Sequence, residues 1–502
     1  MHITRRDVIK TSLATAAATP MGTLTQAAGP QATPFEGPAR AMILIYLPGG
    51  VTQQDTWDPK QYTPFRPGMR GDELLGTCPS IPTSADGIHI GAGLEDVASV
   101  MHHGALIRSL NTDARFGASH VKAQFYALTG YLEPVGLKPP SIGSIVARSL
   151  GPRASNVPSY IYIGREIESE NNLDKQKALE FTGPGFYGPR YAPFRVPDPS
   201  QGLKTLSRLA GMSQERLDRR LEFLSRATTL AGITSDSGSR LPDDAAAAYL
   251  KSIDDARALM DSPVKRAFDF MKDESEQTLA AYRPKIQRED LLDKTYYYGN
   301  HFGYGLLLAR RLVEAGSRFV QVEMSYDAFR GFDMHDFGGQ RMVEMKRQID
   351  GPIAQLIRDL DQRGLLDETL ICIESEFGRT IQSAPAKNST GLAGSEPIGA
   401  SESHDGSDVV IENEKMYGFH GHFSTNHTIA LFGGGIRGGT VYGQTADRHP
   451  MLPIEKPVGL IDVHATIFAA LGIPADHHYI TEDRPFYVTK DGLGVPIREV
   501  LA

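Results

Sequence analysis

Short apolar runs alternate along this chain with longer stretches in which apolar residues recur at helical spacing. The runs that we expect to form strands span 42–47, 105–110, 160–163, 319–322, 370–373 and 428–432. The run at 42–47 is continuously apolar rather than alternating, which predicts a strand buried on both faces of a parallel sheet. From residue 306 onward the order is helix, strand, helix, strand, and this order predicts parallel βαβ units.

The pattern changes twice along the chain and divides it into three parts. Residues 41–199 carry strand runs and are expected to form the first part of an α/β core. Residues 200–300 have helical periodicity, which predicts a helical insertion. Residues 301–502 resume the core and contain a polar stretch, 382–416, which predicts a flexible surface loop or lid. A chain of 502 residues is long enough for one large core and a smaller inserted domain.

The first 27 residues have the pattern of a twin-arginine signal peptide. Arg5 and Arg6 stand in the segment TRRDVIK, a short alanine-rich stretch follows, and small residues near Ala27 offer a cleavage site. We therefore expect the twin-arginine export machinery as a partner, a periplasmic or secreted location, and a Pro- and Gly-rich linker at 28–40. The apolar stretch is too short to span a membrane and no later segment is long enough, so no transmembrane segment is expected.

Charge and cysteine content narrow the class of protein. The first 27 residues contribute +2 to the formal net charge of −8, so a chain without them carries −10. A surface that acidic argues against non-specific nucleic-acid binding. Only two cysteines are present, and Cys372 lies in an apolar run, so we expect no disulfide framework.

Side chains that can bind a metal follow several of the expected strands. In a doubly wound sheet the sites form at the carboxyl ends of the strands. The carboxylates and imidazoles at or beside these ends are Asp55, Asp327, Asp333, His335, Glu376, His420 and His422. Such ligands suit divalent ions, and we expect zinc, manganese or calcium. Other histidines lack this context; His464 lies inside an expected helix and is interpreted as structural or as a neighbour of the site.

Several motifs together resemble one protein family. They are LPGG at 47–50, DTWDPK at 55–60, LARRLVEAG at 308–316, FDMH at 332–335, SEFGRT at 375–380 and a glycine-rich segment at 433–443. In this combination the chain resembles, over essentially its whole length, the domain-of-unknown-function 1501 family of mostly exported bacterial proteins. That family is similar in turn to the alkaline phosphatase and sulfatase superfamily, whose closing segment resembles residues 462–474.

The resemblance implies a fold and a set of metal ligands. The fold is an alkaline phosphatase-like α/β/α sandwich with a mostly parallel central sheet and a helical insertion. The resemblance assigns metal binding to Asp333, His335 and His422, with His420 as an alternate for the late histidine. Glu376 stands where the superfamily has an Asp ligand, and its neighbour Phe377 replaces the usual His. Gly49 occupies the place of the first ligand Asp, for which Asp55 is the nearest substitute.

The resemblance also indicates where a nucleophile should stand. In the superfamily it lies nine or ten residues before a Thr-Gly pair, here Thr129 and Gly130, which leads to Val121 or His120. His120 would then act as a base or as an extra ligand. If the alignment is shifted by one residue, Ser119 is the nucleophile. Arg379 would neutralise the anionic group of the substrate.

Two functions follow from these residues. The first is an exported metal-dependent hydrolase of phosphate or sulfate esters, in which the metal polarises the ester or activates a water. Its substrate would be a small anionic ester or a sulfated or phosphorylated polymer. The alternative is a non-catalytic periplasmic or surface binding protein that keeps the fold without the nucleophile. The retained metal residues favour the enzyme, whereas Phe377 and the missing hydroxyl favour the binding protein.

Overall fold

The computed structural model describes most of the chain after the predicted signal peptide. The described residues are 35–111, 119–132, 137–154, 156–164, 181–206, 211–234, 255–260, 262–326, 329–381, 409–418, 421–423, 425–481 and 484–502. The predicted signal at 1–27, most of the linker at 28–40 and most of the polar stretch at 382–416 lie outside them, as do Asp327 and His420.

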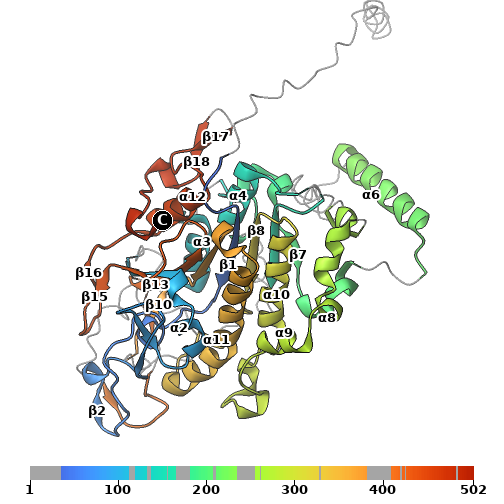
Figure 1. The fold of residues 1–502 in the computed structure, drawn as a ribbon. Helices are drawn as coiled ribbons and strands as arrows, with labels where there is room; N and C mark the ends of the chain where they lie inside the picture. Colours follow the sequence, from blue (N-terminus) through green and yellow to red (C-terminus); the bar gives the residue numbers. More distant parts are fainter. Residues whose placement is uncertain are drawn as a thin grey trace, which may run out of the picture. The chain divides into compact units, whose positions relative to one another are not determined.

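One eight-stranded sheet organises residues 35–502, in the order β14-β5-β13-β9-β1-β8-β6-β7 (Figure 1). Its strands are β1 (Ala41–Tyr46), β5 (Gly104–Leu110), β6 (Tyr160–Gly164), β7 (Phe194–Val196), β8 (Phe319–Glu323), β9 (Thr369–Glu374), β13 (His427–Gly433) and β14 (Thr440–Tyr442). All pairs are parallel except those of β13 with β5 and β9. The mostly parallel sheet predicted from the apolar runs is confirmed, and each of the six runs forms a strand.

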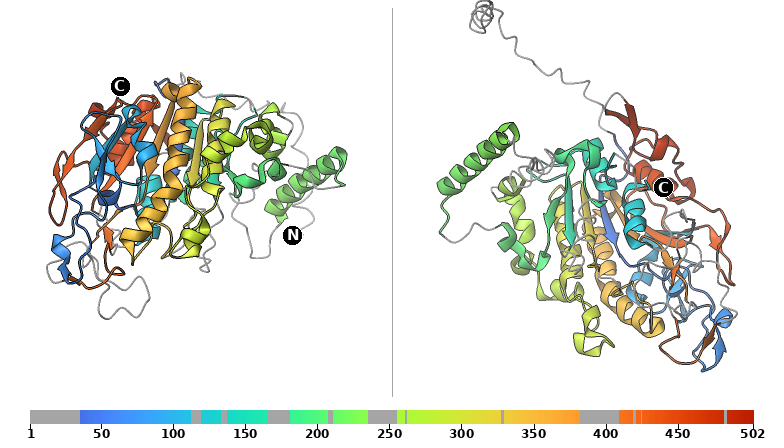
Figure 2. Two further views of the ribbon diagram at one scale, coloured as in Figure 1. Left: turned by 60° about the horizontal axis from the view of Figure 1, so that its bottom comes forward. Right: turned by 180° about the vertical axis from the view of Figure 1, so that it is seen from behind.

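Helices cover both faces of this sheet. Alternate residues of the buried strands point to opposite faces, and each set packs against the helices on its own face. Ile43 and Ile45 of β1 pack with apolar residues of α10 (His301–Glu314) and α11 (Gly338–Gln362). Met42 and Leu44 pack with residues of α4 (Ile142–Leu150) and α12 (Leu460–Ala470), beside α3 (His120–Thr129). Figure 1 shows α10 and α11 on the near side, and Figure 2 shows the molecule from behind. The α/β/α layering is therefore confirmed.

The helix α11 illustrates how sequence periodicity becomes packing. Its predicted apolar positions are buried at spacings of three and four, and they are Met342, Met345, Ile349, Ile353, Leu356 and Leu360. They form one apolar stripe that faces the sheet. Burial of this stripe holds the amphipathic helix against the sheet. The predicted stop of α10 is also confirmed, because Gly316 adopts a φ of +104°, which favours glycine.

One long and two short helices are described between β7 and α10. They are α6 (Gln214–Thr234), α8 (Phe270–Asp273) and α9 (Glu276–Ala281), with 3-10 turns around them. The strands outside the main sheet are β2 (Met69–Arg70), β3 (Ser80–Pro82), β4 (His89–Gly91), β10 (Gly378–Arg379), β11 (Val410–Ile411), β12 (His422–Phe423), β15 (Gln444–Thr445), β16 (Pro453–Glu455), β17 (His478–Thr481) and β18 (Arg484–Tyr487), and one more helix is α2 (Glu95–Ala98). The boundaries of the predicted insertion stay a prediction.

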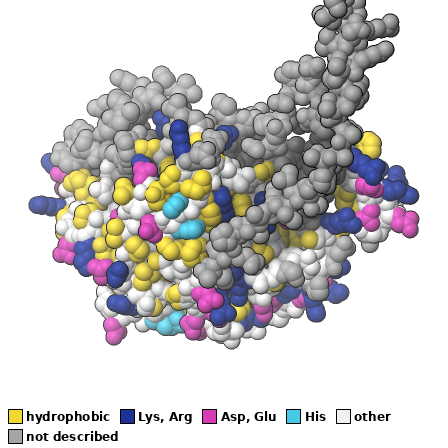
Figure 3. All heavy atoms as spheres, turned by 90° about the horizontal axis from the view of Figure 1, so that it is seen from above, with side chains coloured by type: hydrophobic (Ala, Val, Ile, Leu, Met, Phe, Trp, Pro, Cys, Tyr) yellow, Lys and Arg dark blue, Asp and Glu magenta, His cyan; other side chains and the backbone are white. Residues whose placement is uncertain are grey.

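The surface seen from above mixes side chains of both charges (Figure 3). Lys and Arg are interspersed with Asp and Glu on this face, and hydrophobic side chains gather near its centre. Among the described residues, no helix has both the length and the apolarity that a membrane crossing needs.

Candidate metal centre

Residues far apart in the sequence meet beyond the carboxyl ends of the central strands. Asp333 follows β8, Glu376 follows β9, and His120 is the first residue of α3. The two-stranded pairing of β10 with β12 sets Arg379 opposite His422. The parallel sheet produces this convergence, because the ends of its parallel strands share one edge.

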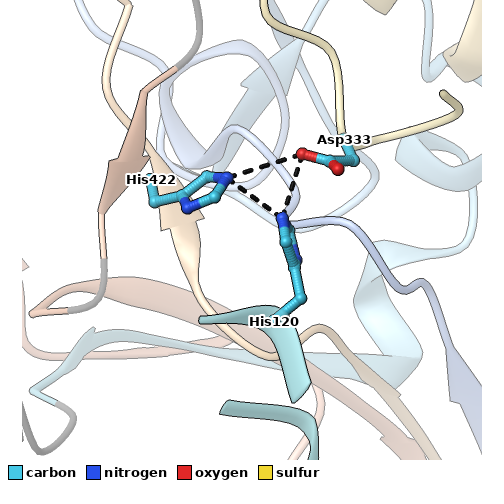
Figure 4. Close-up of side chains that lie close together, drawn as sticks. All are labelled: His120, Asp333 and His422. Carbon is cyan, nitrogen blue, oxygen red and sulfur yellow. Dashed lines mark hydrogen bonds and ion pairs between the residues drawn. The ribbon is translucent and has the colours of Figure 1, made fainter. Parts of the chain in front are cut away.

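His120, Asp333 and His422 form the candidate metal site (Figure 4). Their ligand atoms all lie within 4.8 Å of one another, the one such group found among the described residues. His120 Nε2 lies 3.0 Å from Asp333 Oδ1 and 3.0 Å from His422 Nε2. His422 Nε2 lies 3.5 Å from Asp333 Oδ1.

These separations fit a divalent ion. Donor atoms around a tetrahedral ion with bonds of about 2.0 Å lie about 3.3 Å apart, close to the three distances observed. Two imidazoles and one carboxylate are also the donor set of many zinc sites that keep a position open. The three residues therefore fit a divalent metal site.

Glu376 is held by donors of the protein itself. Its Oε1 lies 2.7 Å from His120 Nδ1 and accepts hydrogen bonds from Gly49 N at 2.8 Å and Gln124 Nε2 at 3.3 Å. Its Oε2 accepts hydrogen bonds from the hydroxyls of Tyr46 and Ser375. A carboxylate on the outer nitrogen of a ligating imidazole fixes the tautomer and the ring orientation. The contacts of Glu376 match that role.

Aromatic rings pack against the imidazoles of His120 and His422. Phe377 is fully buried, and its ring centroid lies 4.8 Å from that of His120 and 4.9 Å from that of His422. The Tyr326 ring lies 5.3 Å from the His120 ring. These contacts leave the histidines little rotational freedom, so their Nε2 atoms are directed at each other before any ligand arrives.

Arg379 is fully buried beside Asp333. Its Nη2 donates to Asp333 Oδ1 at 2.6 Å, and Nε and Nη2 donate to the carbonyl of Phe332. Its Nη1 is buried without a hydrogen-bond partner in the described part of the chain. A buried unpaired donor is rare and calls for an explanation. An anionic ligand beside the metal site would accept from it.

The electrostatics of the cluster follow from burial and close opposite charges. Burial lowers the pKa of His120, but Asp333 and Glu376 outweigh it and raise that pKa to about 9. Burial together with the charges of His120 and Arg379 lowers the pKa of His422 to about 3. Burial acts to raise the pKa of Asp333, yet its histidine partners hold it well below its usual range. A metal binds neutral imidazole, so binding displaces the His120 proton.

The other predicted site residues have different places. His335 Nε2 lies 2.9 Å from Asp333 Oδ1, at the outer side of the cluster. Asp55 is outside the group of three; its Oδ1 accepts from Thr77 N at 2.8 Å. Ser119 is the N-cap of α3, where its side chain accepts from Lys122 N. His420 lies outside the described residues.

Sequence reasoning missed two residues that support the site. Gln124 lies one helical turn after His120, and Tyr46 ends β1. A spacing of four on a helix places two side chains on one face, so the pair His120 and Gln124 could have been singled out once the helix was known. Tyr46 gave no such signal, because it resembles any apolar residue at a strand end.

Comparison with known proteins gives a family. The model of the family described as "Protein of unknown function (DUF1501)" matches residues 39–501. No curated protein matches the chain. Among solved structures, the chain is similar to the lipoteichoic acid synthase LtaP from Listeria monocytogenes (9% identity, 91% of this chain and 76% of that chain, TM-score 0.32). It is also similar to wild type alkaline phosphatase PafA (10%, 93% and 99%, TM-score 0.37) and to PsFucS1 sulfatase from Pseudoalteromonas sp. (12%, 87% and 68%, TM-score 0.33). Likeness at these identities concerns the fold alone.

Proposed function

We propose that this chain, which belongs to the family described as protein of unknown function (DUF1501), is a divalent-metal-dependent hydrolase of phosphate or sulfate esters. The ion is held by His120, Asp333 and His422. The observation that carries the proposal is their convergence within 4.8 Å beside the buried guanidinium of Arg379. A cation site and a guanidinium together suit a tetrahedral oxyanion.

Each residue has a role in this proposal. When bound, the ion supplies Lewis-acid chemistry, polarising the ester and lowering the pKa of water. Glu376 accepts from His120 Nδ1 and so keeps Nε2 turned toward the ion. Arg379 orients Asp333 through Nη2 and donates through Nη1 to the anionic group. His120 has both ring nitrogens engaged, so we assign it to metal binding rather than to general base catalysis.

We further propose that the protein is exported and acts in the periplasm or outside the cell. The support is the segment TRRDVIK and the alanine-rich stretch that follows it. Its substrate is then an ester that occurs there, as a small molecule or as a group on a phosphorylated or sulfated polymer. The twin-arginine pathway carries folded proteins, which suits a site assembled from residues 120 to 422.

The alternative is a protein that binds an anionic ester without turning it over. One observation favours it: the side chain of Ser119 is used as a helix cap rather than being directed at the three metal residues. A hydrolase built this way needs a direct attack by water, with no covalent enzyme intermediate.

Metal content and turnover test the proposal together. We expect the purified mature protein to contain bound metal and Asp333→Ala, His120→Ala and His422→Ala each to lose it, with kcat/KM falling by more than about 100-fold. Ser119→Ala is the matched control, one residue before His120, and should keep both. Metal content would be measured by elemental analysis, folding by circular dichroism, and turnover on a panel of phosphate and sulfate esters.

Two results would contradict parts of this proposal. Wild-type metal content in all three variants would remove the site as described. A metal-loaded wild type that hydrolyses no ester would leave the binding protein as the better function.

Stereochemistry at a chiral phosphate separates direct attack by water from attack by Ser119. One displacement by water inverts the configuration, whereas a Ser119 nucleophile would retain it.

A further inference from the structure

The side chains of the candidate metal site differ in their exposure to solvent. Side-chain exposure rises outward from 3% for Asp333, through 10% for His120 and 12% for His422, to 28% for His335. Beyond His335 stands Phe329, which is 46% exposed and whose ring centroid lies 5.3 Å from that of His335. Phe377, whose ring lies against those of His120 and His422, is fully buried. A substrate that binds at the three residues and reaches solvent past His335 would therefore pass the ring of Phe329.

The backbone of Phe329 is fixed although its ring is exposed. Its N–H donates to Asp333 Oδ2 at 2.9 Å, so its position is tied to a metal residue. Its carbonyl accepts from the Tyr296 hydroxyl at 2.5 Å, and that hydroxyl also accepts from Arg341 Nη1 at 3.0 Å. Both backbone groups are thus bonded, and the ring is presented on a rigid support.

The conformation of Phe329 is costly for a bulky side chain. Its φ of +63° lies in the left-handed region, which favours glycine. Asparagine or glycine would fit this turn with less strain, and a polar side chain would suit the exposed position. Strained residues persist where the surrounding structure holds them, and they cluster at ligand sites. An exposed aromatic ring that is held in this way beside a cluster of polar side chains points to contact with a ligand.

We propose that Phe329 is a stacking platform for a ring in the part of the substrate that lies beyond the scissile ester. The inference rests on the proposed hydrolase function and narrows its substrate class to ring-bearing phosphate or sulfate esters. The shared chemistry is a flat apolar face, which an aryl group or the C–H face of a pyranose supplies. Aromatic side chains bind such faces by offset stacking, and the rigid ring loses little conformational entropy on binding.

Variants of Phe329 test the platform by kinetics. For phenyl and pyranosyl esters we expect Phe329→Ala to lower kcat/KM on the order of tenfold, and Phe329→Trp to keep it near wild type. For an ethyl ester of the same acid all three proteins should be alike, because no ring reaches the platform. The phenyl and pyranosyl arms show which ring is preferred. Phe223→Ala, at a 74% exposed phenylalanine of α6, is the matched control and should leave every ester unaffected.

Ligand binding keeps this test separate from turnover. On metal-loaded protein, phenylphosphonate should bind more tightly than methylphosphonate, and Phe329→Ala should remove the difference. If wild type binds both alike, or if Phe329→Ala weakens binding of the phenyl and methyl ligands equally, the platform is overturned. If the phenyl preference is present and depends on Phe329 but no ester is hydrolysed, the hydrolase proposal fails while the platform stands.

Discussion

At the scale of single residues, the surroundings of Glu376 decide its chemistry. From the sequence it was a predicted metal ligand. In the structure, five protein donors reach its two oxygens, from Tyr46, Gly49, His120, Gln124 and Ser375. A carboxylate has about four lone-pair sites, so these donors leave it little capacity for an ion. Because Glu376 also contacts His120 Nδ1, we propose that it orients His120 rather than binding the ion itself.

This assignment predicts the effect of a neutral isostere. We expect Glu376→Gln to fold but to weaken metal binding by roughly 10- to 100-fold, because the amide orients and polarises His120 less well. Glu374→Gln is the matched control. Burial and the charge of Glu376 raise the pKa of Glu374 to about 8, so a neutral side chain there resembles the form present at pH 7. Titration with Co²⁺ followed by its visible absorption measures the affinity. Equal affinities in the two variants would contradict the role of Glu376.

At the scale of elements, α3 connects the candidate metal centre to the packing of the fold. It presents His120 and Gln124 on one face toward Glu376. Its other end is held by α12, where His464 Nε2 lies 3.0 Å from the Ala127 carbonyl. No amphipathic pattern marks α3 in the sequence, because most of its residues are buried. His464, interpreted from the sequence as structural or as a neighbour of the site, in fact joins two helices.

The buried imidazole of His464 predicts a pH dependence of stability. Burial outweighs its hydrogen bond to Ala127 and lowers its pKa to about 4, from about 6.5 in an unfolded chain. The unfolded chain therefore binds a proton that the folded one excludes. This contribution to stability is complete above pH 6.5 and falls as the pH drops, by on the order of 3 kcal/mol at pH 4.

Urea unfolding at several pH values between 7 and 4 checks this prediction. His464→Gln should flatten the fall in the free energy of unfolding over that range, whatever its effect at pH 7. His89→Gln, at an exposed histidine of β4, should keep the wild-type slope. An unchanged slope in His464→Gln would show that the imidazole is solvated or already protonated in the folded state.

At the scale of the whole molecule, the candidate metal site can form only after the chain has folded. His120, Asp333 and His422 are separated by 213 residues and by a further 89, and they meet only when the sheet is complete. A protein of this kind is best loaded with metal after or during folding, because a preformed site does not exist in the unfolded chain. Export in the folded state fits that requirement.

The proposed export through the twin-arginine pathway predicts a specific loss. Replacing Arg5 and Arg6 together with Lys should leave the precursor in the cytoplasm, because the pathway reads the paired guanidinium groups. Cell fractionation and the size of the protein report the outcome. Changing Lys10 to Arg, within the same segment, is the control and should not impair export. A double mutant that reaches the periplasm at the normal level would contradict the signal.

Local patterns in the sequence determined a large share of this protein. Continuous apolar runs predicted all six strands named from them, and helical spacing predicted α11, because burial on a sheet imposes these periods on any sequence. The motifs predicted the family, which is confirmed. The strand-end rule identified Asp333, His335, Glu376 and His422 as candidate site residues.

Only the tertiary structure decided which of these residues contact one another and in what arrangement. The sequence could not tell that His120 joins Asp333 and His422, that Glu376 stands behind His120, or that Asp55 binds the backbone of Thr77. Nor could it show that Phe329 is exposed beside His335. Contacts of this kind depend on strand order, on the path of each loop and on side-chain direction over distances of a few Å. A local pattern fixes which face a residue occupies, whereas the atom it meets is set by segments hundreds of residues away.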